Sequence, residues 1–165
     1  MDKELVSRIQ RIEDMEAIRK LKHEYCYACD DNYNVEILKA LFTADATWQA
    51  EGFGIFSGTE EIGNFFSGVS RQIVAAAHLV VNDIIHIDDN GLNATGVWRN
   101  IQPATINDDA GDPQAMWLLA RYDEKYIKLD GKWLFKELIA SIQFSASYEK
   151  GWGGLWVNSN QNIKQ

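Results

Sequence analysis

The sequence predicts an α+β fold, in which a curved antiparallel sheet forms a cone around a long N-terminal helix, with two further helices. Two observations support this. Apolar residues recur at helical spacing over residues 5–31, whereas the second half has long β-rich runs separated by hairpin-turn signals at Asp89-Asn90-Gly91 and Asp130-Gly131. Helices followed by antiparallel strands are typical of α+β proteins. A sheet wrapped around the helix buries both apolar faces and leaves an open mouth where a small molecule can bind.

The chain length is typical of one domain. The chain has 165 residues, of which 46% are hydrophobic, enough to form a real core. We expect a single domain over residues 1–165, with a core of about 5–150 and a C-terminal tail of 151–165.

The charge distribution excludes two classes of partner. The formal net charge is -8 and no basic stripe is present, which argues against nucleic acid and against an anionic membrane surface. The N-terminus has no apolar signal region, and no apolar run approaches ~18 residues. The expected location is therefore the cytoplasm.

The predicted helix over 5–31 ends in an unusual way. Its last residues include Asp30 and Asp31, at the helix end where the macrodipole disfavours an acid by ~0.3–1 kcal/mol. Asp30 is therefore a candidate functional residue, with a solvated turn residue as the alternative. The apolar stripe of this helix consists of Leu5, Ile9, Ile12, Met15, Ile18, Leu21 and Tyr25.

The remaining elements follow from pattern and turn residues. We expect helices over 35–42 and from 57 to about 72, the first with Asn34 as N-cap. The run 103–113 is acidic and is expected to be a loop. Strands are expected over 46–50, 76–88, 92–102, 115–129 and 132–147, with 53–56 as a possible short strand.

His78 lies near the start of the predicted strand 76–88, which has largely apolar residues on both faces. It is either a core residue satisfied by one hydrogen bond or a general base. The three histidines lack metal-ligand spacing, and no phosphate-binding or dinucleotide motif is present, so no metal or cofactor is expected. Cys26 and Cys29 lie near a helix C-terminus rather than an N-terminus, which favours buried thiols over a redox pair.

Several aromatic residues at strand spacing are candidates for a pocket wall, although most such residues form core. The candidates for substrate binding are Trp48, Phe53, Trp98, Trp117 and Phe144.

The order of these parts resembles the SnoaL-like branch of the nuclear-transport-factor-2-like (cystatin-like) superfamily. The resemblance covers roughly residues 5–150. It rests on five segments in this order: 25–30 (YCYACD), 41–48 (LFTADATW), 58–62 (GTEEI), 78–82 (HLVVN) and 123–133 (DEKYIKLDGKW).

The resemblance implies a site. Scytalone dehydratase, the bile-acid 7α-dehydratase and the hexachlorocyclohexane dehydrochlorinase share this fold and use an Asp–His pair, whose positions Asp30 and His78 match. The two dehydratases also use a Tyr five residues before the Asp, which Tyr25 matches, and Trp48 matches a pocket Trp in the first strand. By the same resemblance, the C-terminal tail would close the mouth of the pocket. Relatives often form dimers or trimers, so a homo-oligomer is expected.

The resulting hypothesis is a cofactor-independent lyase that acts on a small, largely apolar molecule. His78 would take a proton, Asp30 would hold the imidazole, and Tyr25 would donate a hydrogen bond. Tyr25 and Asp30 lie ~140° apart around an ideal helix, so both face one cavity only if the helix end tightens or Asp30 lies just beyond it. The alternatives are an isomerase or polyketide cyclase that uses the same pair, and a non-catalytic small-molecule binding module.

Overall fold

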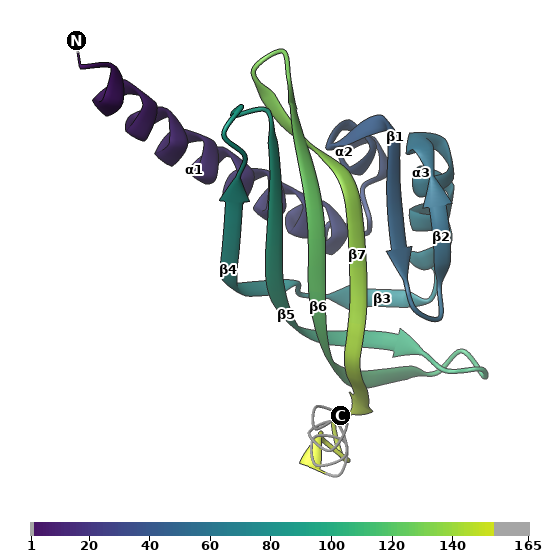
Figure 1. Cartoon of the computed structure of the whole chain (residues 1–165). Coiled ribbons are helices and arrows are strands. Elements are labelled where there is room, and N and C mark those ends of the chain that lie inside the picture. The colour runs from purple at the N-terminus through teal and green to yellow at the C-terminus, as the bar shows by residue number, and fades with distance from the viewer. Residues whose placement is uncertain (1, 154–165) are drawn as a thin grey trace, which may run out of the picture.

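The computed structural model describes residues 2–153. It begins with the predicted long helix, α1 (Lys3–Asp30), whose first turn is capped by the side chain of Asp2 accepting from the amide of Glu4. Figure 1 shows that the N-terminal half of α1 projects from the body of the protein. The stripe is therefore buried only in part: Ile12 is 63% exposed, whereas Ile18 is fully buried.

Two shorter helices complete the helical part, as predicted. Helix α2 (Val35–Ala40) begins at Asn34, whose side chain accepts a hydrogen bond from the amide of Ile37. A hairpin of β1 (Phe42–Ala50) and β2 (Gly54–Ser57) leads into α3 (Gly58–Val69).

The second half of the chain forms most of one seven-stranded sheet. Its strands are β3 (Ile73–Ala76), β4 (Leu79–Ile87), β5 (Asn93–Asn107), β6 (Pro113–Leu129) and β7 (Lys132–Ser147). The order is β2-β1-β7-β6-β5-β3, and β4 also pairs with β5. Only the β1–β7 pair is parallel, so the curled sheet is mixed while remaining the predicted cystatin-like α+β cone.

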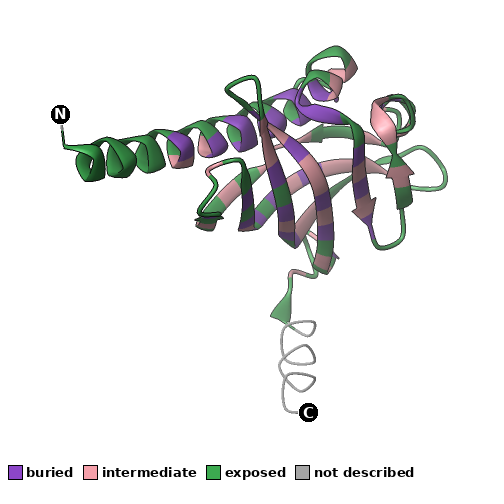
Figure 2. Ribbon diagram, turned by 45° about the horizontal axis from the view of Figure 1, so that its top comes forward, coloured by how far each residue is buried: buried purple, intermediate pink, exposed green. Residues whose placement is uncertain are grey.

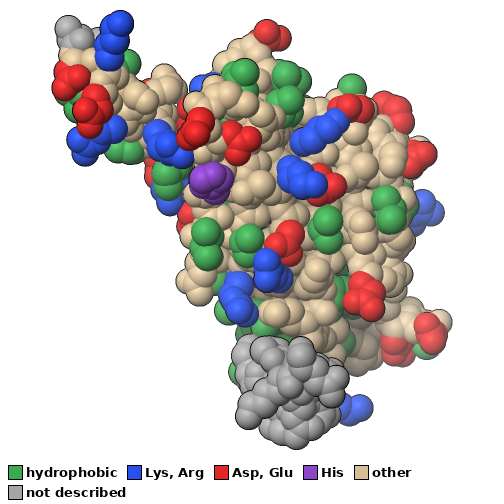
Figure 3. All heavy atoms as spheres, in the orientation of Figure 1, with side chains coloured by type: hydrophobic (Ala, Val, Ile, Leu, Met, Phe, Trp, Pro, Cys, Tyr) green, Lys and Arg blue, Asp and Glu red, His purple; other side chains and the backbone are tan. Residues whose placement is uncertain are grey.

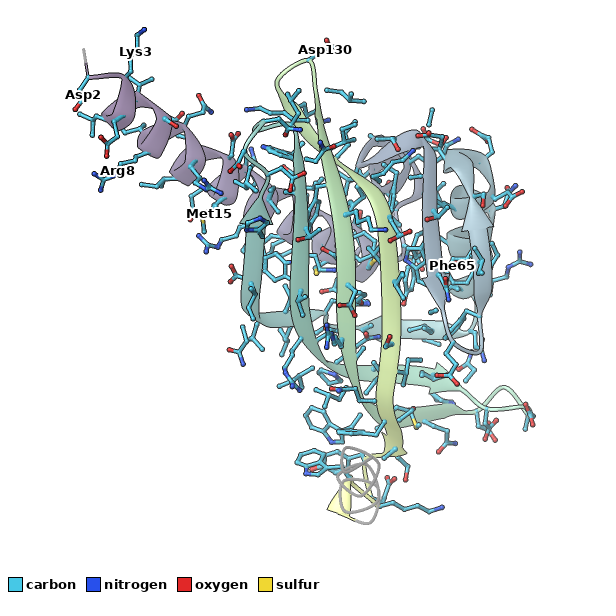
Figure 4. The ribbon with its side chains drawn as sticks, in the orientation of Figure 1. Asp2, Lys3, Arg8, Met15, Phe65 and Asp130 are labelled. Atoms are coloured by element: carbon cyan, nitrogen blue, oxygen red, sulfur yellow. The ribbon has the colours of Figure 1, made fainter. Side chains whose placement is uncertain are left out.

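The main cluster of buried hydrophobic residues lies on the concave side of this sheet. Figure 2 shows buried and exposed residues alternating along the strands and an exposed N-terminal part of α1, whose buried residues begin at Asp14. The core is rich in aromatic side chains from α1, α3 and the sheet. Phe65 of α3, labelled in Figure 4, lies against Trp48 of β1 and Phe56 of β2, at ring-centroid distances of 4.5 and 4.3 Å.

Two expectations of secondary structure were wrong. The predicted strand 76–88 is interrupted, since residues 77 and 78 separate β3 from β4. The segment 103–113 is not a loop throughout, because β5 continues to Asn107 and pairs there with both β6 and β3, a strand that was not predicted. Pro103 lacks an N–H, but its carbonyl accepts from the amide of Ala77 at 3.1 Å. The N and O atoms of a strand residue point toward the same neighbouring strand. The N–H that Pro103 lacks would therefore face the gap between β3 and β4, so neither strand pair loses a hydrogen bond.

The surface gives two further findings. On the face shown in Figure 3, acidic and basic side chains are interspersed. Within residues 2–153, no helix has the length and apolar character that crossing a membrane requires.

Candidate active site

Asp30 and His78 are in direct contact. The Asp30 carboxylate lies 2.6 Å from Nδ1 of His78 and also accepts from the His78 peptide N–H, at 3.1 Å from each oxygen. Asp30 is the last residue of α1, and His78 lies between β3 and β4. The imidazole is 6% exposed and the carboxylate 28% exposed. The two elements thus bring together two residues that are 48 positions apart in sequence.

The end of α1 explains how an acid is accommodated there. The chain turns through Asn32 and Tyr33, both with a φ of 53°, and the amides of Tyr33 and Asn34 donate to the last-turn carbonyls of Cys29 and Ala28. An acid at this end costs about 0.3–1 kcal/mol through the macrodipole. Hydrogen bonds to a charged group contribute about 1.5–3 kcal/mol each, so the donors of His78 outweigh this cost.

His78 lies in the wall of a cavity of about 70 Å³ on the concave side of the sheet. Asp30 does not line this cavity. It borders a separate outer hollow, to which His78 also contributes. The cavity is lined by Tyr25, Tyr33, Trp48, Ala50, Phe53, Phe65, Phe66, Val69, Ile73, His78, Gln102, Leu118, Ala120, Tyr122, Ala140 and Ile142.

The contact with Asp30 determines which imidazole nitrogen can act. An ionised carboxylate only accepts hydrogen bonds, so Nδ1 of His78 carries the hydrogen that it donates to Asp30. The second ring nitrogen, Nε2, then has the free lone pair. Chemically, this arrangement can accept a proton from a molecule in the cavity and stabilise the resulting imidazolium.

Tyr25 supplies a hydroxyl to the same cavity. Its ring is 2% exposed, and its oxygen accepts from the indole N–H of Trp48 at 3.0 Å. Burial raises the pKa of Tyr25 well above its ordinary value, so the hydroxyl keeps its hydrogen. The hydroxyl therefore accepts from Trp48, and it also forms a side-chain hydrogen bond with the buried thiol of Cys29.

Tyr33 is a cavity residue that sequence reasoning missed. Its ring stacks on Phe66 at 5.7 Å and meets the imidazole of His78 edge-on at 6.3 Å and 90°. Burial raises the pKa of its hydroxyl above the ordinary value. The periodicity of the sequence does not predict that Tyr33 lines the cavity, because its position depends on two consecutive left-handed backbone conformations after α1.

Gln102 is the second cavity residue that was missed. It is 5% exposed and lies on the concave face of β5, two residues from the buried Asn100. The alternation of side chains along a strand was the available signal, because residues 98, 100 and 102 must share one face.

Two of the five predicted substrate-binding aromatics line the cavity, and three do not. Trp48 and Phe53 belong to the lining. Trp98 packs against His23 of α1 at a ring-centroid distance of 6.3 Å, and its indole N–H donates to the hydroxyl of Tyr126 at 2.9 Å. Trp117 and Phe144 lie on the other face of the sheet, in a groove completed by Trp152.

The tail and the cysteines are placed as follows. Trp152 packs against Trp117 at 5.7 Å, away from the cavity lining, and the rest of the tail lies outside the described residues. Cys26 and Cys29 are buried free thiols, as predicted, and burial raises the pKa of Cys26 to about 11. Within residues 2–153, no cluster of three or more His, Cys, Asp or Glu could hold a metal ion.

A buried ion pair lies next to the cavity. Lys22 of α1 and Glu124 of β6 are both fully buried, with Nζ 2.5 Å from the carboxylate. The ammonium lies 3.4 Å from the ring centroid of Tyr122, a cavity residue, and the hydroxyl of Tyr126 donates to Glu124. The pair therefore fixes α1 to the sheet directly behind the cavity wall.

Comparisons with known proteins agree with this architecture. A protein from Novosphingobium aromaticivorans assigned as a scytalone dehydratase is 22% identical, with 86% of this chain and 91% of that chain covered at a TM-score of 0.75. A hexachlorocyclohexane dehydrochlorinase (LinA type 3) from Novosphingobium barchaimii is 19% identical, with 85% and 93% covered at a TM-score of 0.76. A cystatin-like protein of unknown function from Nostoc punctiforme is 21% identical, with 78% and 90% covered at 0.65.

At these identities the likeness shows the fold alone. A search of curated protein sequences finds no match. The model of the SnoaL-like domain matches residues 10–139, which is most of the chain. This protein therefore belongs to the SnoaL-like domain family.

Proposed function

We propose that this protein is a cofactor-independent lyase of the dehydratase or dehydrohalogenase type. The observation that carries the proposal is the 2.6 Å contact between Asp30 and Nδ1 of His78, with the imidazole in the wall of a mostly aromatic cavity. A carboxylate behind an imidazole fixes its tautomer and stabilises its charged form. The fold neighbours, which include a dehydrochlorinase and a dehydratase-type protein, are consistent with this reaction class.

In the proposed reaction, Nε2 of His78 removes a proton from a carbon of the substrate. The electron pair of that C–H bond forms a double bond to the neighbouring carbon, and the leaving group departs with its own bonding pair. Asp30 stabilises the imidazolium, and the hydroxyl of Tyr25 donates a hydrogen bond to the leaving group or to an oxygen that gains negative charge.

The walls of the cavity indicate the kind of substrate. Trp48, Phe53 and Phe65 contribute apolar aromatic surface, and the remaining lining offers few polar groups. We therefore propose a small, largely apolar substrate that bears a leaving group next to an acidic C–H bond. The expected homo-oligomer, a dimer or trimer, stays a prediction.

The same pair also suits an isomerase or a polyketide cyclase, in which the proton is returned to another atom and no group is lost. A binding module would use the Asp30–His78 contact only as a structural hydrogen bond. Product analysis separates these possibilities, because a lyase releases water or halide, an isomerase changes no mass, and a binding protein returns the ligand unchanged.

The direct test is incubation of the protein with a panel of β-hydroxy ketones, scytalone and hexachlorocyclohexane, with products measured by mass spectrometry and chloride release. We expect loss of water or hydrogen chloride from at least one compound, and loss of that turnover in the His78→Ala variant. His86→Ala is the matched control, since His86 is an exposed residue of β4. Unchanged compounds throughout, or a His78→Ala variant with the wild-type rate, would refute the proposal.

A further inference from the structure

Two amide side chains lie side by side on the concave face of β5, in surroundings that are otherwise mostly apolar. Asn100 is fully buried and Gln102 is 5% exposed. Nδ2 of Asn100 donates to Oε1 of Gln102 at 2.9 Å. Among the described residues, no group donates to Oδ1 of Asn100, which is buried. A fold gains little stability from burying amides with an unmet acceptor, so this arrangement calls for another explanation.

The sheet places Gln102 directly beside His78. Ala76 is paired with Ala104, and Leu79 is paired with Ile101, so the same register puts residue 78 opposite residue 102. The amide of Ala77 donates to the carbonyl of Pro103 at 3.1 Å and holds this register across the gap between β3 and β4. Both side chains line the cavity. Residues directly opposite each other have Cβ atoms about 4.5–5.5 Å apart, so the amide and the imidazole reach the same small molecule.

The hydrogen bond from Asn100 determines what Gln102 offers to that molecule. It occupies Oε1, and the Nε2 group of Gln102 donates to no other described residue. The cavity therefore has a neutral N–H donor next to the proposed base. A neutral donor matches a carbonyl oxygen, and it matches a haloalkane poorly because carbon-bound halogen is a weak acceptor.

We propose that Gln102, oriented by Asn100, binds the carbonyl oxygen of a neutral substrate whose adjacent carbon loses its proton to His78. This proposal rests on the function proposed above and narrows its substrate class to carbonyl compounds with a leaving group on the β-carbon. When His78 takes the α-proton, the electron pair moves onto the carbonyl oxygen and gives an enolate, which Nε2 of Gln102 stabilises. The enolate then re-forms its carbonyl, expels hydroxide from the β-carbon and leaves an enone. The imidazolium protonates the hydroxide to water.

The test measures binding without turnover. The probes are 2-tetralone and 1,2,3,4-tetrahydronaphthalene, which have the same ring system with and without a carbonyl oxygen and lack a leaving group. Isothermal titration should show that the wild-type protein binds the ketone roughly five- to tenfold more tightly, the value of one neutral hydrogen bond. Gln102→Met, which keeps the length of the side chain and removes the donor, should abolish this preference.

Gln143→Met is the matched control, because this glutamine is exposed on β7 and accepts from Arg99 outside the cavity. The control should keep the wild-type preference. Equal affinity of the wild-type protein for the two probes, no binding of either, or a preference that survives in Gln102→Met would overturn the proposal.

A second measurement needs no variant, in case Gln102→Met fails to fold. The infrared carbonyl stretch of bound 2-tetralone should lie at lower frequency than in a hydrocarbon solvent, and an unshifted band would overturn the proposal. His78→Ala should retain the ketone preference although it loses turnover. If the preference is found and no compound is turned over, only the proposed lyase function fails.

Discussion

The side chains of Tyr25 and Asp30 project from the same helix into two different cavities, and His78 contributes to both. Tyr25 lines the inner cavity, whereas Asp30 borders the outer hollow and reaches the cavity only through its contact with the imidazole. Their five-residue separation, ~140° around an ideal helix, therefore requires no distortion of α1. The arrangement places the carboxylate behind the imidazole and leaves both His78 and Tyr25 in the cavity wall.

This relationship predicts different effects for two substitutions of Asp30. Asp30→Asn keeps an acceptor for His78 but lacks the charge that stabilises an imidazolium, so turnover should fall by at least about a hundredfold while the melting temperature changes little. Asp30→Ala removes the acceptor for the ring and the peptide N–H, and should also lower the unfolding free energy by about 1–3 kcal/mol. Rates of product formation and urea unfolding measure the two effects.

The control for this prediction is Asp31→Asn at the next position, where the side chain is exposed and accepts from Asn34. It should leave turnover at the wild-type level. An Asp30→Asn variant that matches the activity of Asp31→Asn would show that the carboxylate charge is not used.

Tyr25→Phe should affect both stability and turnover. The change leaves the buried indole N–H of Trp48 without its acceptor, which should cost about 1–3 kcal/mol of unfolding free energy. It also removes the proposed donor to the leaving group, so turnover should fall on the order of a hundredfold. Thermal unfolding and single-turnover rates report the two losses separately.

Tyr27→Phe is the appropriate comparison, because Tyr27 belongs to the same helix and is 76% exposed. It should change neither quantity. A Tyr25→Phe variant that loses stability but retains turnover would assign to this tyrosine a structural role alone.

Much of the fold could be predicted because its signals are local. The Asn34 cap, the Asp130-Gly131 turn and the helix over α1 each follow from one short stretch, and the structure has all three, although only the C-terminal part of the apolar stripe is buried. The extension of β5 beyond Pro103 could not be predicted in this way. It depends on pairing with β3 and β6, and tertiary pairing overrides the turn-like composition of that segment.

The site could be predicted only in part. The match of Asp30 and His78 came from resemblance, since no spacing rule places two residues so far apart in sequence in contact. The position of Trp117 outside the cavity follows from the alternation of side chains along a strand. Trp117 lies five residues from the cavity residue Tyr122 on β6, and an odd separation puts two residues on opposite faces of the sheet. Tyr33 was beyond such rules, because a left-handed tyrosine is rare and depends on its surroundings.

The buried thiols predict a loss of stability at alkaline pH. Burial raises the pKa of Cys26 to about 11, and it raises the pKa of Cys29 in the same direction. The folded state then holds these protons after the unfolded state has released them. Above the ordinary thiol pKa, near 9.0, each group therefore lowers the unfolding free energy by up to about 1.4 kcal/mol per pH unit.

Urea unfolding between pH 8.5 and 10.5 checks this prediction. The double variant Cys26→Ala/Cys29→Ala should show a shallower decline of unfolding free energy with pH than the wild-type protein. Val69→Ala removes buried apolar atoms without removing a titratable group, so it should lower stability at every pH and leave the slope unchanged. Equal slopes in all three proteins would contradict the assignment to the thiols.

The Lys22–Glu124 pair predicts strong coupling between α1 and β6. Lys22→Met leaves a fully buried carboxylate without its cation and should cost about 3–5 kcal/mol of unfolding free energy. The double variant Lys22→Met/Glu124→Gln removes both charges and keeps an acceptor for the hydroxyl of Tyr126. Its loss should be smaller than the sum of the two single losses by about 1–3 kcal/mol, measured as a double-mutant cycle in urea.

The exposed pair Lys20–Glu24 on the same helix provides the control. Its atoms are 3.7 Å apart and its side chains are 78% and 45% exposed, so Lys20→Met should change stability by at most about 0.5 kcal/mol. If Lys22→Met also costs less than 1 kcal/mol, roughly the upper end for an exposed pair, then Glu124 does not carry its charge in the folded protein. Additive single losses would lead to the same conclusion, because a neutral Glu124 has no charge for Lys22 to compensate.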